Sequence, residues 1–193
     1  IPSSGGYEID QSLRFNDDDS AYLSKTFASA GNRKTWTWSA WVKQGNSGQQ
    51  AMFGADVGSN ALYFESDGRI THEKHSPNYY KQSTAKFRDP SAWYHIVAVW
   101  NTPDSTAVDR QILYVNGTKL TEFDTDNQPP LNHDSNINNN IAHNVGNRGR
   151  TPIASAGWDG HIAEVHFIDG TALTPSSFGE TGDYGEWKPK EVS

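Results

Sequence analysis

Apolar and polar residues alternate along short segments of this chain, and residues that favour turns separate the segments. The clearest alternation runs through Thr35–Lys43, which reads TWTWSAWVK. Because side chains of a β-strand point alternately to the two faces of a sheet, this segment predicts a strand with one apolar face. The residues expected on that face are Trp36, Trp38, Ala40 and Val42.

Further segments of the same kind follow at near-regular intervals along the chain. Trp93–Trp100 is apolar at nearly every position, which is typical of a strand that is covered on both faces. Asn116-Gly117 lies between two such segments and is a strong signal for a tight β-hairpin. The other expected strands are Ala51–Val57, Ala61–Glu65, Arg69–Glu73, Arg110–Val115, Thr118–Phe123 and Trp158–Ile168.

Helical patterns are nearly absent. Thr174-Pro175 could begin a helix, but Gly179 would end it after about one turn. Residues 74–88 and 124–140 are expected to be loops because polar and turn-forming residues dominate both stretches. The pattern therefore predicts an all-β fold, a two-sheet antiparallel β-sandwich with at most one or two short helical turns. We expect one domain over residues 1–193, with linker-like ends at about 1–6 and 184–193.

The composition disfavours several classes of protein. The 193 residues include no cysteine, so a disulfide scaffold, a cysteine-ligated zinc site and thiol catalysis are excluded. The formal net charge of −7 repels phosphate and disfavours nucleic-acid binding. No stretch approaches the ~20 apolar residues that a membrane-spanning helix needs, so we expect no membrane insertion. No signal-peptide pattern opens the sequence, and its start at Ile1 favours an excised domain.

Aromatic residues are unusually frequent, at 12% of a chain in which only 34% of residues are hydrophobic. Part of this aromatic content must fill the core because aliphatic residues are scarce. The residues expected in the core are Trp36, Trp38, Tyr94, Phe167 and one of Trp93 or Trp100. The remaining aromatic residues are available for a binding surface.

Five segments, in this order, carry a resemblance to a known family: SLRFNDDDSAYLS, TWTWSAWVK, DPSAWYHIVAVW, LYVNGTKL and GWDGHIAEVHFIDGTALTPSSFG. Together they resemble a concanavalin A-like jelly roll of the laminin-G-like type, over about Gln11–Gly179. The stretch HIAEVHFIDGTALTPSSFGE, followed by WKPK, is similar to modules in structural and tail proteins of tailed phages. The resemblance implies the jelly-roll fold, and a virion or extracellular location within a larger protein, but no single activity.

Catalysis is not expected. Glycosidases of this fold use an E-x-D-x-x-E spacing to bring their carboxylates together. Glu65-Ser66-Asp67 instead continues to Ile70 where the third carboxylate should stand. A lyase would need a tyrosine and histidine pair near an arginine, and the chain offers candidates only at the frequency that chance supplies. His95, His161 and His166 lie in apolar strands and are expected to be structural.

Calcium is a weaker prediction. The resemblance is to families in which calcium shapes a loop or bridges to sugar, and hard oxygen ligands suit this ion. The candidate ligands are Asp17, Asp19, Asp124 and Asp126. Asp and Asn residues also belong in solvated turns for backbone reasons, which leaves the alternative open.

Carbohydrate binding needs aromatic rings that stack on sugars, together with amides, carboxylates or guanidinium groups that bind hydroxyls. Trp41 faces away from the apolar face of its strand, while Tyr79-Tyr80 belongs to no apolar run. Trp158 stands at a loop-to-strand entry, near amide and guanidinium groups in sequence. The full set of candidate carbohydrate-binding residues is Trp41, Tyr79, Tyr80, Asn144, Asn147, Arg148 and Trp158.

The sequence therefore predicts a non-catalytic carbohydrate-binding module of a phage virion or tail-type protein, whose partner is a polysaccharide or cell-surface glycan. The alternative is a structural domain that packs or decorates a virion and contacts another protein chain. No nucleic-acid partner is expected. Other chains of a virion, or other domains of a larger parent protein, are further candidate partners.

Overall fold

The strand predicted from TWTWSAWVK forms as β3 (Thr35–Gln44) at the centre of a six-stranded antiparallel sheet. The computed structural model describes residues 7–55, 60–74, 78–149 and 156–192. In spatial order, the six-stranded sheet contains β1 (Leu13–Phe15), β13 (Gly160–Asp169), β3, β8 (Tyr94–Asn101), β9 (Gln111–Val115) and β10 (Thr118–Lys119).

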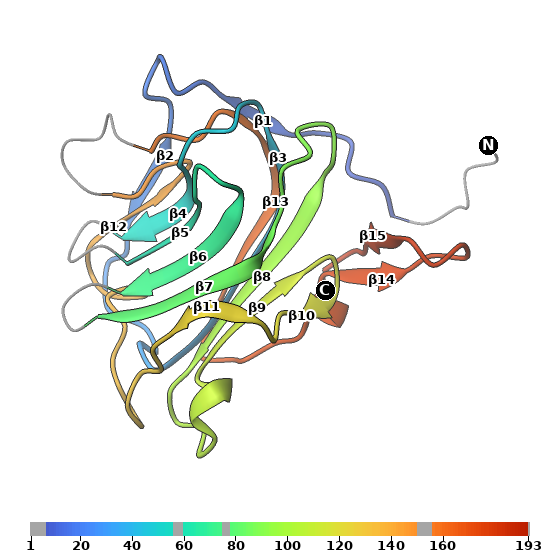
Figure 1. Ribbon diagram of the computed structural model, residues 1–193. Coiled ribbons are helices and arrows are strands. Elements are labelled where there is room, and N and C mark those ends of the chain that lie inside the picture. Colours follow the sequence, from blue (N-terminus) through green and yellow to red (C-terminus); the bar gives the residue numbers. More distant parts are fainter. Residues whose placement is uncertain (1–6, 56–59, 75–77, 150–155, 193) are drawn as a thin grey trace.

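A seven-stranded antiparallel sheet packs against the first, as Figure 1 shows. In spatial order it contains β11 (Phe123–Asp126), β7 (Tyr79–Lys86), β6 (Arg69–Lys74), β5 (Asn60–Phe64), β4 (Gln50–Ala55), β12 (Ala142–Val145) and β2 (Leu23–Thr26). In each sheet we call the face turned toward the other sheet inner, and the opposite face outer. The predicted two-sheet β-sandwich is confirmed, and so are the short helical turns, of which η1 (Ala107–Asp109) and η2 (Pro175–Ser177) are described. No helix among the described residues is long and apolar enough to cross a membrane.

Aromatic rings fill the core between the sheets. Trp36 and Trp100 stack with their centroids 6.3 Å apart and their planes within 5°. Trp38 stacks on Phe53 of the opposite sheet at 5.8 Å. The predicted core residues Trp36, Trp38, Tyr94 and Trp100 are buried, and Phe167 packs against them. Large rings thus supply the buried area that the few aliphatic residues cannot.

A third, small layer covers part of the outer face of the six-stranded sheet. It contains the hairpin of β14 (Gly179–Thr181) and β15 (Trp187–Pro189), which Figure 1 shows beside β10. Val97 and Val99 of β8 pack there against Phe178, in a cluster separate from the main core. The prediction of a linker-like end at 184–193 is therefore wrong for β15. Residues 1–6 lie outside the described residues.

The prediction of a loop at 74–88 is also wrong, because β7 occupies most of this stretch. This strand lacks apolar alternation. Its buried Lys81 pairs with Asp126, and the hydroxyl of its buried Ser83 accepts a hydrogen bond from the Ile70 N–H. Because β7 carries polar residues on both faces, it lacks the apolar and polar alternation by which the other strands were predicted. The predicted loop 124–140 likewise begins inside β11. The predicted strand Thr118–Phe123 is strand only at its ends, over β10 and at the first residue of β11.

The hairpin at Asn116-Gly117 is confirmed: it joins β9 to β10, and both residues adopt positive φ, at 47° and 79°. The Asn116 side chain also accepts a hydrogen bond from the backbone N–H of His95, at 2.8 Å. The turn is therefore tied to β8 as well as to its own two strands.

We predict that acid weakens the fold through buried histidines. Burial lowers the pKa of His72, which packs against both Trp36 and Trp100, to about 3. Burial likewise lowers the pKa of His95 to about 4. Below pH 6.5 the unfolded chain binds protons that the folded chain excludes, so stability is lost as the pH falls from 6.5 toward these values. Between pH 7.5 and pH 5 we expect a loss of about 2 kcal/mol for each of these histidines.

Urea unfolding at pH 7.5, 6 and 5 measures this slope, above the pH range in which most carboxylates titrate. The His72→Gln variant should unfold with a smaller loss between pH 7.5 and pH 5, whatever its stability at pH 7.5. A variant with the wild-type slope would contradict the assignment to His72.

Candidate functional site

The outer face of the seven-stranded sheet carries a continuous hydrogen-bonded network. The Tyr63 hydroxyl donates to the Glu73 carboxylate at 2.6 Å and lies 3.2 Å from the Tyr80 hydroxyl. Tyr80 in turn donates to Glu65 at 3.0 Å, and the Gln82 amide donates to the same carboxylate at 2.9 Å. Strands β5, β6 and β7 supply these side chains, except for Glu65, which directly follows β5. We call Tyr63, Glu65, Glu73, Tyr80, Gln82 and Arg148 the polar face.

Arg148 joins this network from the segment that follows β12. Its guanidinium lies 4.1 Å from the centroid of the Tyr63 ring and donates to Glu73 at 3.1 Å. Gly54 of β4 makes this approach possible, because a Cβ at that position would lie 2.3 Å from the Arg148 carbonyl oxygen. The missing side chain lets the 147–149 backbone rest directly on β4.

The network fixes the protonation of its tyrosines. Burial, and after it the Glu73 carboxylate, raise the pKa of Tyr63 far above its usual range. Burial is also the main cause of the raised pKa of Tyr80. Both phenols therefore stay protonated near neutral pH and act as hydrogen-bond donors. The carboxylates of Glu65 and Glu73 are the acceptors that hold them in place.

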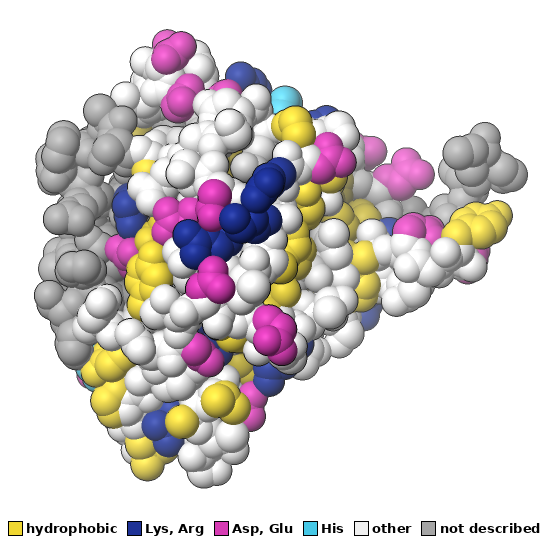
Figure 2. All heavy atoms as spheres, viewed as in Figure 1, with side chains coloured by type: hydrophobic (Ala, Val, Ile, Leu, Met, Phe, Trp, Pro, Cys, Tyr) yellow, Lys and Arg dark blue, Asp and Glu magenta, His cyan; other side chains and the backbone are white. Residues whose placement is uncertain are grey.

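Charged residues border the polar face where β6 begins and β7 ends. Arg69 binds both Asp67 and Asp124, and Lys86 binds Asp67 at 3.1 Å. Although desolvation opposes the change, hydrogen bonds from Arg69 and Lys86 lower the pKa of Asp67 to about 2. Figure 2 shows such Lys, Arg, Asp and Glu side chains side by side on this face. The border is thus charged but internally compensated.

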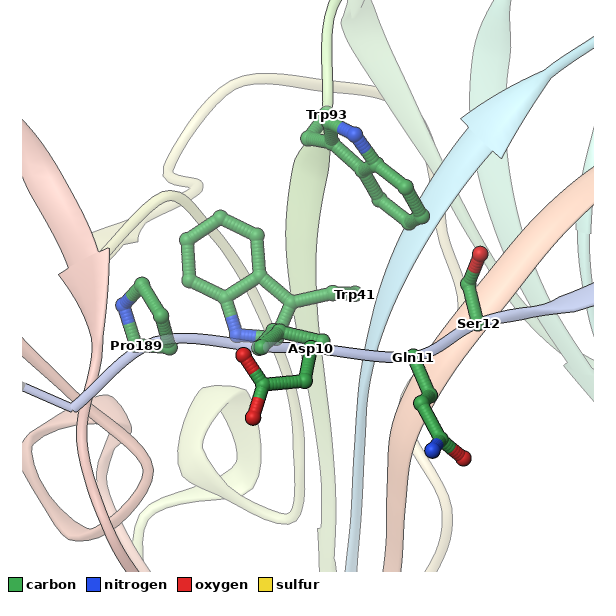
Figure 3. Close-up of a pocket in the computed structure, with 7 residues that line it drawn as sticks. Asp10, Gln11, Ser12, Trp41, Trp93 and Pro189 are labelled. Carbon is green, nitrogen blue, oxygen red and sulfur yellow. The ribbon is translucent and has the colours of Figure 1, made fainter.

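A separate pocket lies on the outer face of the six-stranded sheet. Trp41 and Trp93 line a cavity of about 310 Å³, shown in Figure 3. Residues 10–12 of the N-terminal segment run past the two indoles, and Pro189 of β15 lies on the other side of Trp41. Ile9, Asp10, Gln11 and Ser12 complete the lining. We call this the tryptophan pocket.

His95 holds Trp41 in place from behind. The two rings stack at 4.9 Å, and the Trp187 ring lies beside His95 with the centroids 5.9 Å apart. The Trp187 indole donates to Nδ1 of His95 at 2.9 Å, while Nε2 lies 2.8 Å from the Ser39 hydroxyl. Because Nδ1 is the acceptor, the neutral ring carries its proton on Nε2 and donates to Ser39. Trp41 is therefore buried, which sequence reasoning left open.

The structure brings together only two of the predicted binding residues, Tyr80 and Arg148. Tyr79 points the other way along β7 and packs edge-on against His133 at 4.8 Å. Trp158 is fully buried and packs on Phe64, so the prediction that it could stack on a sugar is wrong. Its place at a loop-to-strand entry was compatible with a buried or an exposed ring, and the indole fills the core.

Two predicted amides are also buried. Asn144 of β12 is 6% exposed, and Asn147 is 1% exposed. Asn147 has a structural task, since its side-chain oxygen accepts a hydrogen bond from the Gly149 N–H at 3.0 Å. Neither amide can contact a ligand as the chain stands.

Sequence reasoning missed Tyr63, Glu65, Glu73 and Gln82. Alternation from the buried Leu62 and Phe64 could have placed Tyr63 on the outer face. The contact between Glu73 and Arg148 had no such signal, because it spans 75 positions in the chain. One of Trp93 and Trp100 was predicted to lie in the core: Trp100 is buried, whereas Trp93 is 37% exposed.

Calcium stays a prediction. Among the described residues, no group of three or more His, Asp or Glu side chains is arranged to hold a metal ion. Asp124 and Asp126 already pair with Arg69 and Lys81. Asp17 accepts a hydrogen bond from Asn46, and Asp19 accepts one from Asn16.

A family model described as the concanavalin A-like lectin/glucanases superfamily matches residues 15–177, most of the chain. The chain belongs to this superfamily. The laminin-G-like resemblance predicted from five sequence segments is thereby confirmed. No curated protein sequence matches the chain.

Solved structures of this superfamily fold are similar in shape but distant in sequence. A heptameric SAP-like pentraxin from Limulus polyphemus shares 17% identity at a TM-score of 0.56, over 88% of this chain and 75% of the pentraxin. Domain 4 of AbnA, an extracellular GH43 arabinanase of Geobacillus stearothermophilus in complex with arabinotriose, shares 21% identity at 0.54, over 77% and 66%. Tailspike protein 2 of Escherichia coli O157:H7 bacteriophage CAB120 shares 12% at 0.55, over 86% of this chain but 23% of the tailspike. Identities this low establish the common fold alone.

We predict that Gly54→Ala destabilises the protein and displaces Arg148. The added Cβ would clash with the Arg148 backbone, which cannot swing aside as a flexible side chain could. Overpacking of this kind costs about 1–3 kcal/mol, measurable by urea unfolding. Gly157→Ala is the matched control, since its Cβ would meet its nearest neighbours at an ordinary 3.6 Å. Equal stability of the two variants would contradict the prediction.

Proposed function

We propose that this domain is a non-catalytic carbohydrate-binding module whose polar face binds a glycan. The observation that carries the proposal is the meeting of Tyr80 and Arg148 with Glu65 and Glu73 on one sheet face. Guanidinium, carboxylate and amide groups can each pair with two neighbouring hydroxyls of a sugar. The half-buried Tyr80 ring adds an aromatic surface beside them.

Preorganisation supports the proposal. Every side chain of the polar face has at least one partner within the network, so little rotamer freedom is left to lose on binding. A shallow face excludes little water, and we expect an affinity of about 10–1000 μM for one glycan. Repetition of the domain on a larger particle would raise avidity by about 10²–10⁴.

The protonation of the network argues against catalysis there. A tyrosine can act as the base of a lyase only after it has lost its own proton. Burial and Glu73 raise the pKa of Tyr63 far above its usual range, so this phenol stays protonated. Glu65 and Glu73 accept hydrogen bonds from two phenols, an amide and a guanidinium. These groups are arranged to hold hydroxyls rather than to attack a glycosidic bond.

A virion or tail-type parent protein is part of the proposal. It is supported by the fold shared with a phage tailspike, of which this chain spans 23%. In such a protein the domain would meet bacterial surface polysaccharide, and it would act outside the cell that produced it. The arabinanase domain that binds arabinotriose supports the choice of a glycan ligand for this fold.

We predict that Tyr80→Ala weakens glycan binding by about tenfold, because it removes the ring and three hydrogen bonds of the polar face. Tyr80→Phe keeps the ring and should fall between wild type and alanine. A glycan array of bacterial surface polysaccharides and plant or algal glucans identifies a ligand, and calorimetry then measures each variant.

Tyr22→Ala is the matched control, since Tyr22 is an exposed tyrosine outside the network. It should bind like the wild type. No retention on any glycan, or a Tyr80→Ala variant with unchanged affinity, would overturn the proposal.

A structural role in packing against another chain is the second candidate, and one observation favours it. Leu13, Leu23 and Val165 are 53%, 51% and 40% exposed, and they line one apolar cavity of about 280 Å³ at the edge of the sandwich. Apolar side chains gathered in this way often mark a contact with a protein.

If this second candidate holds, the protein should self-associate in light scattering as its concentration rises, and Leu23→Glu should return it to the monomer. Ser24→Glu is the control, because it adds the same charge one residue further along β2. A wild-type protein that stays monomeric at every concentration would argue against self-association through this edge.

A further inference from the structure

The tryptophan pocket lies on the opposite sheet from the polar face, and the proposed function does not use it. It is lined by two indoles, one carboxylate, one amide and one hydroxyl group, together with Ile9 and Pro189. Trp93 is 37% exposed and so keeps ring surface free for a ligand, whereas Trp41 is 7% exposed and forms a wall. An aromatic surface with a few converging polar groups is the usual make-up of a small-ligand site.

The aromatic wall of this pocket is rigid before any ligand arrives. Trp41 stacks on His95, whose two ring nitrogens are held by Trp187 and Ser39. Trp93 contacts the ring of His161 edge-on at 6.3 Å, and Nδ1 of His161 lies 3.0 Å from the Ser12 hydroxyl. A wall fixed in this way avoids the ordering cost that a flexible site would incur on binding.

Two of the polar groups at the pocket are free to bind a ligand. Within the described part of the chain, no hydrogen bond or ion pair holds the side chains of Asp10 and Gln11, and both residues are exposed. The segment that carries them is held in place immediately after Ser12, where β1 pairs with β13 through Leu13 and Ile162. A carboxylate and an amide therefore stand beside two indoles without a partner of their own.

We infer that the tryptophan pocket is a second carbohydrate site, which binds one neutral pyranose with the apolar face of the sugar on Trp93. The volume of about 310 Å³ is at the small end for ligand sites, so it suits one ring rather than a long chain. Asp10 is the one charged residue among the described lining residues, and its negative charge disfavours a uronic acid. Asp10 and Gln11 bind the hydroxyls. The inference extends the proposed function from one glycan site to two, one on each sheet.

Nuclear magnetic resonance of the indole N–H groups tests the pocket directly. Neutral oligosaccharides of glucose, galactose and mannose are titrated into the wild-type protein, with the matching uronates in parallel. We expect the indole signals of Trp93 and Trp41 to shift with neutral sugars and to shift less with uronates. The expected site affinity is weak, on the order of 1 mM for a single ring.

Three variants make the test specific. Trp93→Ala should weaken binding at the pocket by about tenfold, and Trp93→Phe by less, because the smaller ring still stacks. Asp10→Asn keeps an acceptor oxygen but removes the charge, so it should leave neutral-sugar affinity within about threefold and strengthen uronate binding. Tyr184→Ala, which removes an 89% exposed ring elsewhere, should change nothing.

The outcomes separate this inference from the proposed function. Indole signals that stay unmoved by every sugar overturn the second site, even where Tyr80→Ala weakens binding at the polar face as predicted. Shifts of the Trp41 indole signal that persist in Tyr80→Ala, and that need about tenfold more sugar in Trp93→Ala, support it. A wild-type pocket that prefers uronates, or an Asp10→Asn variant with unchanged selectivity, overturns the assignment to neutral sugar.

Discussion

The alternation of side chains along β3 is the constraint on which the rest of the molecule depends. Its inner face places Trp36 and Trp38 in the core, where they stack on rings from β8 and from the opposite sheet. Its outer face places Ser39 and Trp41 around His95. A slip by one residue would exchange the two sets, burying hydroxyls in the core and exposing two indoles. One strand therefore fixes both the sandwich and the wall of the tryptophan pocket.

The two candidate sites hold their side chains in place in different ways. On the polar face, charge is balanced inside the network, and Arg148 is held by Glu73 and by the Tyr63 ring. In the tryptophan pocket, rigidity comes from stacked rings, while Asp10 and Gln11 remain unengaged. A network whose charges are balanced favours glycans whose hydroxyls fit its geometry. Free polar groups beside an indole favour the binding of a single sugar ring.

How much could be predicted from sequence depends on whether a signal is local. β3 and β8 were predictable because apolar residues repeat at strand spacing within each segment. β7 was not, because Lys81 and Ser83 are buried through an ion pair and hydrogen bonds rather than through apolar packing. The arrangement that links Tyr80 to Arg148 through Tyr63 was also beyond prediction, although Tyr80 and Arg148 were each named as candidates. It depends on Gly54, whose role appears only once the backbone of Arg148 lies upon it.

The hairpin of β14 and β15 has a consequence for where this domain ends. The family match stops at residue 177, yet Trp187 donates its indole hydrogen to His95, and Phe178 covers Val97 and Val99. A polypeptide that ended at residue 177 would lose this cover, and Val97 and Val99 of β8 would be exposed to solvent. Such exposure invites association between molecules. The described residues beyond this boundary, from Phe178 onward, thus keep this part of the six-stranded sheet from becoming adhesive in its own right.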